Sequence, residues 1–277
     1  MAEVAELDTA PDTIEATVNY LKDTGEAPWT YSGGEGSTEV KSSGTPDPHR
    51  VTLRNGRPHA GDFILDRDGF RFVRHDTAMK DFLDPDEVKR VYYPEMEALI
   101  KQESGAKRVI VFDHTLRTAD DADREARKIR EPVQRAHNDY TEWSGPQRVR
   151  DLLPDEADEL LKRRFAIVQV WRPIRYPIET FPLAICDARS VASSDFVISE
   201  RRYPNRVGQT YAIKYNPAHQ WFWFPRQARN EAIVFKVYDS DKDGRARWTA
   251  HTALTDPTSP PGARPRESIE IRTLAFF

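Results

Sequence analysis

The chain has 277 residues, a formal net charge of −4 at pH 7 and one cysteine, Cys186. This length suits one large domain with a substantial core. A single cysteine excludes an internal disulfide framework and any cysteine-based metal cluster, and the acidic charge argues against a nucleic-acid partner.

Residues 1–50 are polar and rich in Thr, Ser, Gly, Asp and Pro, so we expect an N-terminal arm with little core of its own. Residues 51–277 are expected to form a single domain. No apolar run in the chain approaches the roughly 18 residues that span a bilayer, and residues 1–6 do not resemble a signal peptide. We therefore expect a cytoplasmic protein with no membrane partner, and the sequence makes no prediction about its oligomeric state.

The first half of this domain is predicted to mix strands and helices. Two short strands are expected to flank a tight turn at Asn55-Gly56. A helix is expected to open at Asp84-Pro85 and to be interrupted at Pro94, which is expected to restart a helix that carries Met96, Leu99 and Ile100. Residues 109–112 are apolar enough for a buried strand, whereas the charged residues 118–131 indicate an exposed helix or loop.

After a helical segment that begins near Gly145-Pro146 and restarts at Pro154, the chain changes to strands. Residues 165–171 are apolar on both faces except at Gln169, which is typical of a central strand buried on two sides. Further strands are predicted, with turns between them, over residues 183–185, 211–215, 221–224, 232–238 and 269–274. The predicted fold is mainly β with flanking helices, an antiparallel barrel or jelly roll.

His137-x-Asp139 is the first candidate for chemistry. Residues two apart on an extended strand point to the same face, so this imidazole and this carboxylate could meet at one point. A second imidazole would complete the two-His-one-carboxylate set that holds non-haem Fe(II). His251 is the best candidate for it, although short triplets of this kind most often arise by chance.

A polar face on the last strand supplies a second candidate. Arg266, Ser268, Glu270 and Arg272 share this face, and Ile269 and Ile271 share the other. If the polar face looks into a barrel, Arg266 and Ser268 could hold a carboxylate, because Arg presents a planar fork of donors. The alternative is a surface strand with a polar outer side.

Four further residues are weaker candidates for substrate binding. Arg172 could anchor a carboxylate or could pair with Asp187. Tyr140, Tyr215 and Trp223 could line a pocket, although aromatic side chains at strand spacing more often belong to the core.

Other polar motifs are expected to be structural. His114 and His219 are predicted to be hydrogen-bonded residues rather than ligands. The run from Asp239 to Gly244 imitates the start of a calcium loop, but its twelfth position is Ala250 where a Glu is needed, so an acidic turn is predicted. Cys186 is expected to be buried.

From about Gly69 to Phe277 the sequence resembles the Fe(II)/2-oxoglutarate-dependent oxygenases, and among them the fungal hydroxylase/desaturase group related to gibberellin desaturase and cephamycin methoxylation proteins. Five ordered segments carry the resemblance: residues 109–117 (VIVFDHTLR), 136–141 (AHNDYT), 170–173 with 182–190 (VWRP and PLAICDARS), 219–225 (HQWFWFP) and 256–272.

The resemblance implies a double-stranded β-helix, a cupin-like jelly roll, that holds iron. It implies that His137, Asp139 and His251 bind Fe(II), and that Arg266 and Ser268 bind the distal carboxylate of 2-oxoglutarate. The implied reaction uses O2 and oxidises an unactivated C–H bond of a small molecule in specialised metabolism, by hydroxylation, desaturation or ring formation. Amino acids and modified peptides are among the expected substrates.

Two other functions fit the same residues. A zinc-dependent hydrolase could use the same three ligands around an activated water. A barrel-fold binding protein without catalysis could use the face of Arg266 to capture an acidic ligand.

Overall fold

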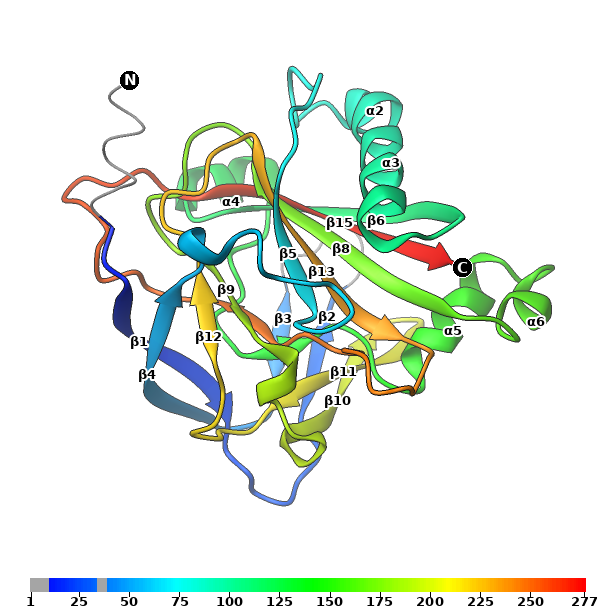
Figure 1. Cartoon of the computed structure of the whole chain (residues 1–277). Helices are drawn as coiled ribbons and strands as arrows, with labels where there is room; N and C mark the ends of the chain where they lie inside the picture. The colour runs from blue at the N-terminus through cyan, green and yellow to red at the C-terminus, as the bar shows by residue number, and fades with distance from the viewer. Residues whose placement is uncertain (1–9, 34–38) are drawn as a thin grey trace.

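The computed structural model describes residues 10–33 and 39–277, which form two β-sheets (Figure 1). The larger sheet has ten strands in the order β1-β4-β12-β9-β14-β7-β11-β10-β2-β3, and the smaller has five in the order β5-β13-β8-β15-β6. Neighbouring strands are antiparallel except in the pairs β10–β2 and β12–β4. The strands of the larger sheet are β1 Thr13–Leu21, β2 Trp29–Ser32, β3 Val40–Ser42, β4 Pro46–Asn55, β7 His137–Asn138, β9 Leu183–Cys186, β10 Phe196–Tyr203, β11 Arg206–Ile213, β12 Trp221–Trp223 and β14 His251–Ala253. Those of the smaller sheet are β5 Phe70–Arg74, β6 Arg108–Thr118, β8 Phe165–Pro173, β13 Glu231–Asp239 and β15 Glu267–Phe276.

Strand β8 lies in the centre of the smaller sheet, between β13 and β15, and all nine of its residues are buried. The prediction of a strand covered on both faces is therefore confirmed. One face packs towards the larger sheet, in a cluster that joins Trp171 of β8 to Ile185 of β9 and Phe222 of β12. The other face packs with α3. Burial on both sides explains why β8 carries almost no polar side chain.

One long helical segment covers the outer face of the smaller sheet. It comprises α2 Pro85–Glu87, a π-helical stretch Val88–Tyr92 and α3 Tyr93–Ser104. The Asp84 carboxylate caps its start by accepting hydrogen bonds from two backbone N–H groups, as its position before Pro85 predicts. The helical segment changes character at Pro94, as expected: the π-helical stretch ends at Tyr92, and Pro94 lies in the first turn of α3, which buries Met96, Leu99 and Ile100.

The remaining helices are short and peripheral. Helix α4 (Asp121–Arg127) is exposed or half-exposed, as the charged sequence predicts. Helices α5 (Ser144–Leu152) and α6 (Ala157–Leu160) precede β8, and the break between them falls at Pro154, where a restart is predicted. Three 3-10 turns complete the list: Arg57–His59, Ala188–Ser190 and Ser193–Asp195.

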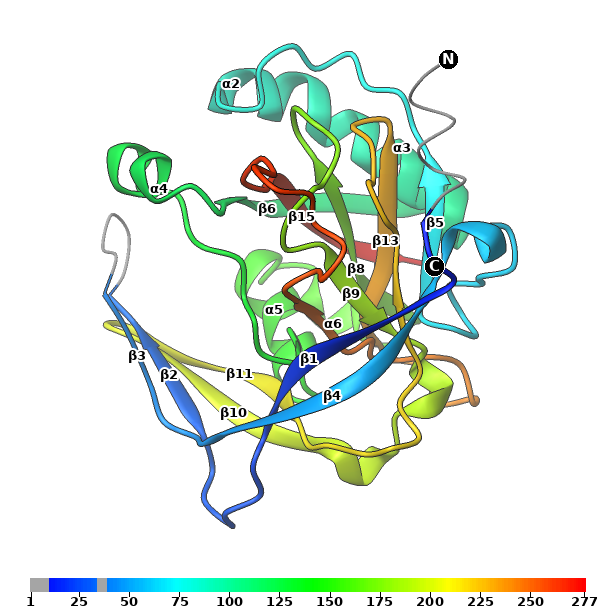
Figure 2. The same cartoon turned by 90° about the vertical axis from the view of Figure 1, so that its left-hand side faces the viewer.

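The described part of residues 1–50 differs from the expected polar arm. Strand β1 pairs along its whole length with β4, and it buries Ile14, Ala16, Val18 and Tyr20. These residues alternate with polar ones, which is the period of a strand with one covered face. Figure 2 shows β1 and β4 continuing the curve of the sheet that β10 and β11 form.

Asn55-Gly56 does not form the expected hairpin. Strand β4 belongs to the larger sheet and β5 to the smaller, and Gly56 instead leads into a 3-10 turn. A Cβ at Gly56 would lie 2.5 Å from the Phe224 ring, so the close approach of this ring requires glycine.

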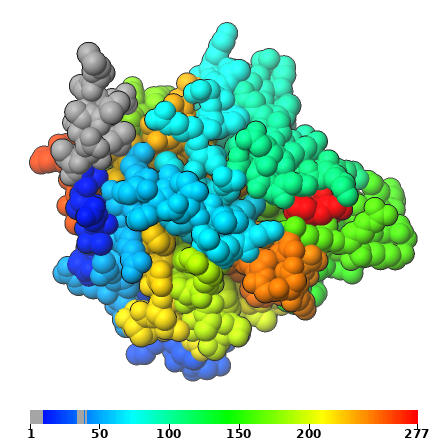
Figure 3. Space-filling model, in the orientation of Figure 1, coloured from blue at the N-terminus to red at the C-terminus, as the bar shows by residue number. Residues whose placement is uncertain are grey.

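In the space-filling view little of the C-terminal strand is visible, because other segments cover β15 (Figure 3).

Candidate metal centre and its two cavities

His137 and His251 lie side by side because their strands pair. Strand β7 pairs with β14, His137 is directly opposite His251, and the two ring centroids are 4.3 Å apart. Asp139 follows β7 directly. The three residues bring one ligand atom each to within 4.8 Å of one another, so the predicted set is assembled at one point.

Backbone carbonyl groups orient both imidazoles. Nδ1 of His137 lies 2.7 Å from the carbonyl oxygen of Arg135, and Nδ1 of His251 lies 3.0 Å from that of Thr249. Because a carbonyl can only accept, each Nδ1 carries the proton and each Nε2 keeps its lone pair. Burial, with the neighbouring His251 as the next cause, lowers the pKa of His137 to about 3. The imidazole is therefore neutral at physiological pH, the form that binds a metal.

The carboxylate of Asp139 is held by its second oxygen. Oδ2 accepts a hydrogen bond of 2.6 Å from Gln169 and lies 3.6 Å from Nε of Arg272, while Oδ1 lies 3.6 Å from Nε2 of His137. Burial raises the pKa of this carboxyl group, but the charge of Arg272 and the hydrogen bond from Gln169 act against burial, and the pKa lies below its ordinary value. An ionised carboxylate with one oxygen free, together with two imidazoles, fits Fe(II).

Asn138 lies between His137 and Asp139, and its side chain connects this segment to both sheets. Its buried amide donates to the carbonyl oxygens of Tyr140 (2.7 Å) and Val237 (2.9 Å), and its oxygen accepts from Thr249 N–H (3.1 Å). Val237 belongs to β13 of the smaller sheet, and the Thr249 carbonyl orients His251. The residue at the central position of H-x-D thus fixes the spacing of all three ligands.

A small cavity extends from the three ligands to Arg266. We call it the inner cavity, and it is lined by Arg117, Val133, His137, Asp139, Leu183, His251, Thr252, Ala253, Arg266, Glu270 and Arg272. Arg266 is only 3% exposed, donates to Ser268 Oγ (2.9 Å) and to the Phe181 carbonyl (2.8 Å), and lies over the Trp171 ring. Within residues 10–33 and 39–277 no carboxylate lies within 4.0 Å of it. Burial, and then the charge of Arg117, lowers its pKa to about 9. A buried cation held only by neutral groups is suited to bind an anion.

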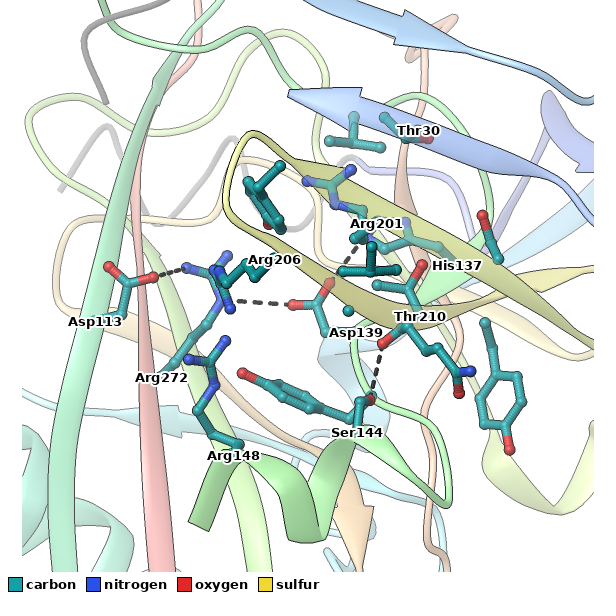
Figure 4. A pocket seen from close by; sticks show the side chains of 18 of the residues that line it. Thr30, Asp113, His137, Asp139, Ser144, Arg148, Arg201, Arg206, Thr210 and Arg272 are labelled. Carbon is teal, nitrogen blue, oxygen red and sulfur yellow. Dashed lines mark hydrogen bonds and ion pairs between the residues drawn. The ribbon is translucent and has the colours of Figure 1, made fainter. Parts of the chain in front are cut away.

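A second, wider cavity, the outer cavity, shares His137 and Asp139 with the first and has a volume of about 490 Å³. Its walls are β10, β11, α5 and the segment before β7, and a volume of this size admits a small organic molecule. In Figure 4, Arg148 and Arg272 lie on one side of Asp139, and Arg201 lies on the other side beside Thr30 of β2. Burial, followed by the like charge of Arg201, lowers the pKa of Arg135 on the same wall.

Of the four weaker candidates, the structure brings only Tyr140 to the outer cavity. Arg172 is fully buried elsewhere, where it donates to the carbonyls of Arg229 and His75, and Asp187 instead pairs with Arg189. Tyr215 stacks on His49 at a centroid distance of 3.6 Å. Trp223 is buried in the core between β1, β4 and β12. These three residues line neither cavity, because each lies on a part of the sheet that faces the core or solvent.

The motifs that were predicted to be structural are structural. His114 hydrogen-bonds to Tyr93, and His219 to Tyr20 and Asp195. Asp239 pairs with Lys236, and Asp243 with Arg245. Cys186 is buried, and burial raises the pKa of its thiol to about 12.

Sequence reasoning missed the residues that support the ligands. Gln169 is the only polar residue in the apolar run 165–171 of β8, and this exception was a usable signal that it has a partner inside the core. Arg272 lies on the polar face of the last strand, as predicted, but nothing in the sequence places it next to Asp139. Arg201 lies on β10, whose polar sequence does not predict a strand.

Comparison with known proteins agrees with this geometry. A family model described as "Oxidoreductase/YMDC permease-like domain" matches residues 18–276. The α-ketoglutarate-dependent dioxygenase phiK of Fungal sp. (strain ATCC 74256) is 33% identical over 82% of this chain and 84% of its own length. The hydroxylase/desaturase efuI of Hormonema carpetanum is 32% identical over 96% of this chain and 95% of its own. Among solved structures, the iron- and α-ketoglutarate-dependent endoperoxidase NvfI matches with a TM-score of 0.84 and 27% identity, over 96% of this chain and 99% of that one.

No helix in the described ranges is long and apolar enough to cross a membrane. The structural match confirms the predicted double-stranded β-helix, with helices outside the two sheets. Several relatives and the matching structures are named for α-ketoglutarate (2-oxoglutarate), and the family uses Fe(II), 2-oxoglutarate and O2. The chain therefore belongs to the Fe(II)/2-oxoglutarate-dependent dioxygenases, in the group that contains the fungal hydroxylase/desaturases.

Proposed function

We propose that His137, Asp139 and His251 bind Fe(II) in this dioxygenase, and that Arg266 and Ser268 bind the distal carboxylate of 2-oxoglutarate. The observation that carries the proposal is the position of the three ligand atoms, which lie within 4.8 Å of one another where the two cavities meet. Bound Fe(II) supplies the activation of O2 that couples decarboxylation of 2-oxoglutarate to oxidation of a C–H bond.

The residues of the chain position the reactants. Arg266 offers a charged fork at the end of the inner cavity, and Ser268 Oγ accepts from Arg266 Nε, which keeps the fork in place. Gln169 and Arg272 hold Oδ2 of Asp139, so that Oδ1 stays directed at the metal. The outer cavity is left for the substrate, and the wall that the substrate touches determines which C–H bond lies near the iron.

The substrate is a small molecule, and we propose that it belongs to specialised metabolism. Relatives with the names hydroxylase/desaturase, dioxygenase and "Aspirochlorine biosynthesis protein N" support this proposal. Hydroxylation, desaturation and ring formation all begin with removal of one hydrogen, so the same ligand set serves each of them. An amino acid or a modified peptide stays among the proposed substrates.

The two alternative functions are less well supported. A zinc hydrolase needs neither Arg266 nor the inner cavity, and the relatives and matching structures are named for iron and 2-oxoglutarate. A binding protein without catalysis would not need two imidazoles whose Nε2 atoms converge on one carboxylate.

The proposal is tested by adding Fe(II) and 2-oxoglutarate to the protein without oxygen. Chelation of iron by the cosubstrate gives a visible charge-transfer band, and admission of O2 then releases succinate. The variant His137→Ala is expected to lose both signals. A variant lacking His137, Asp139 and His251 together that still gives the band would overturn the ligand assignment.

Two further points about the whole protein stay proposals. We propose one catalytic domain, to which the described part of residues 1–50 adds β1, β2 and β3, while residues 1–9 and 34–38 lie outside the described ranges. We also propose a cytoplasmic location, which the single buried cysteine supports.

A further inference from the structure

The outer cavity has a strong excess of positive charge in a chain whose net charge is −4. Seven arginines line it: Arg117, Arg130, Arg135, Arg148, Arg201, Arg206 and Arg272. The acidic residues that line it are Asp113, Asp139 and Asp151. A formal excess of four positive charges (7 − 3) is therefore concentrated on the walls of one cavity.

Arg135 and Arg201 are two of the arginines of this cavity that have no acidic partner among the described residues, and the charge of Arg201 acts on Arg135. Asp113 pairs with Arg272, and Asp151 hydrogen-bonds to Gln147. In the parts of the chain that the structure describes, no carboxylate lies within 4.0 Å of either Arg135 or Arg201. Two half-buried guanidinium groups that repel each other cost stability, and a bound anion removes this cost.

The proposed iron and cosubstrate do not supply that anion. Fe(II) carries two positive charges and 2-oxoglutarate two negative charges, so together they are neutral. The cosubstrate is also proposed to lie in the inner cavity, against Arg266. The positive charge of the outer cavity therefore remains for the substrate.

Two apolar side chains lie at the rim of the outer cavity, among exposed charged residues such as Arg206 and Asp151. Trp143 and Val207 are 50% and 56% exposed, and they are among the most exposed large hydrophobic residues of the described chain. Tyr140 and Tyr211 add aromatic surface further inside. Apolar and aromatic side chains beside a basic wall suit a molecule with an apolar body and an acidic group.

We propose that the substrate of this dioxygenase is an organic carboxylate with an apolar body, and that Arg135 and Arg201 bind its carboxylate group. This inference rests on the proposed function, and it adds the class of substrate. Arg135 precedes the ligand His137 by two residues, so the bound carboxylate lies close to the metal centre. The C–H bond that is oxidised then lies a short distance along the chain or ring from the acid group.

The test uses two fluorescent probes of nearly equal size, 1-pyrenebutyrate and the neutral 1-pyrenebutanol. Each is titrated without oxygen into the full-length enzyme loaded with Fe(II) and 2-oxoglutarate. The carboxylate probe is expected to bind at least about 10-fold more tightly than the alcohol, which corresponds to about 1.4 kcal/mol. The variant Arg201→Met is expected to remove most of this preference and to leave binding of the alcohol unchanged.

Arg202→Met is the matched control. Arg202 is the next residue on β10, pairs with Glu200 and lies outside the lining of the outer cavity, so its loss changes the net charge equally. This control is expected to keep the preference for the carboxylate probe. Equal binding of the two probes by the wild-type enzyme, or equal weakening in the two variants, overturns the proposal.

The charge-transfer band separates this proposal from the one on which it rests. Arg201→Met with an intact band has a folded metal centre, so an unchanged preference for the carboxylate in that variant counts against the anion site alone. Loss of the band already in the wild-type enzyme counts against the proposed function.

Discussion

The two cavities that meet at the metal centre both contain arginines, but they hold them differently. On the inner side, Arg266 is fixed by Ser268, the Phe181 carbonyl and the Trp171 ring. On the outer side, Arg135 and Arg201 have no such partners among the described residues. A site for one constant ligand benefits from donors that are already in place, since less conformational entropy is lost on binding. The outer arginines keep more side-chain freedom until a ligand binds.

His137→Ala should have the largest effect, because this residue belongs to both cavities. We expect the variant to lose iron binding and turnover completely, since Asp139 and His251 alone form an incomplete ligand set. Metal content after dialysis and the charge-transfer band measure the loss. His114→Ala is the control, and it should keep both signals because His114 contacts Tyr93, away from the ligands. Full iron occupancy in His137→Ala would contradict the assignment.

Arg266→Met should affect the inner cavity alone. Removal of one partner of a buried charge pair costs about 2 kcal/mol or more, so the affinity for 2-oxoglutarate should fall at least about 30-fold. Titration of the charge-transfer band with 2-oxoglutarate gives the affinity. The control Arg264→Met removes an exposed arginine two residues earlier that pairs loosely with Glu179. A variant Arg266→Met with unchanged cosubstrate affinity but weaker binding of 1-pyrenebutyrate would reverse the roles of the two cavities.

Gln169→Leu should disturb Asp139, which lines both cavities. Without the hydrogen bond to Oδ2, the Asp139 carboxylate can rotate, and the loss of such a supporting contact costs about 10- to 100-fold in metal affinity. Competition with a chelator measures this affinity. Circular dichroism should be unchanged, because Leu fills a similar volume in β8. An unaltered affinity would mean that Arg272 alone orients the carboxylate.

His219→Gln should have the smallest effect and shows what separates a structural imidazole from a ligand. Both ring nitrogens of His219 have partners, Tyr20 and Asp195, whereas Nε2 of His137 has none but the carboxylate. Burial lowers the pKa of His219, although Asp195 opposes it. The imidazole is thus neutral in the folded chain and takes up a proton on unfolding below pH about 6.5, so this residue makes stability fall as the pH falls from that value.

We therefore expect the melting temperature of His219→Gln to depend less steeply on pH between about 6.5 and 5 than that of the wild type. Iron binding should be unchanged. The control His59→Gln, at an exposed position, should keep the wild-type slope. A steeper slope in His219→Gln would mean that the imidazole is charged in the folded protein.

Much of the fold follows from local patterns in the sequence. The double-sided apolar run of β8 and the cap at Asp84 predict their elements because short-range physics decides them. Strand β1 was predictable too, from the alternation of Ile14, Ala16, Val18 and Tyr20, but its polar surroundings obscured it. Strand β10 was not predictable, because it contains three consecutive charged residues, Glu200, Arg201 and Arg202. Its pairing with β11 and β2 makes it a strand.

The candidate site also contains residues that the sequence could predict and residues that it could not. The H-x-D triplet, His251, Arg266 and Ser268 could be selected from residue type, spacing and resemblance. The contacts of Gln169 and Arg272 with Asp139 join segments 30 and 133 (272 − 139) residues apart, so they depend on how the two sheets face each other. Arg172 was selected wrongly by its residue type. An arginine suits a carboxylate site, but in this fold Arg172 donates hydrogen bonds to the backbone carbonyls of Arg229 and His75.

The hydrogen bonds of Asn138 have a practical consequence for engineering. Its amide fastens β7 to β13 and to the segment before His251, while the other edge of β7 pairs with β11 at Tyr211 and Ala212. Strand β10 does not pair with β7, so a library of side chains on β10 can alter what is oxidised while the proposed iron ligands stay in place. Position 138 itself should be kept out of any such library.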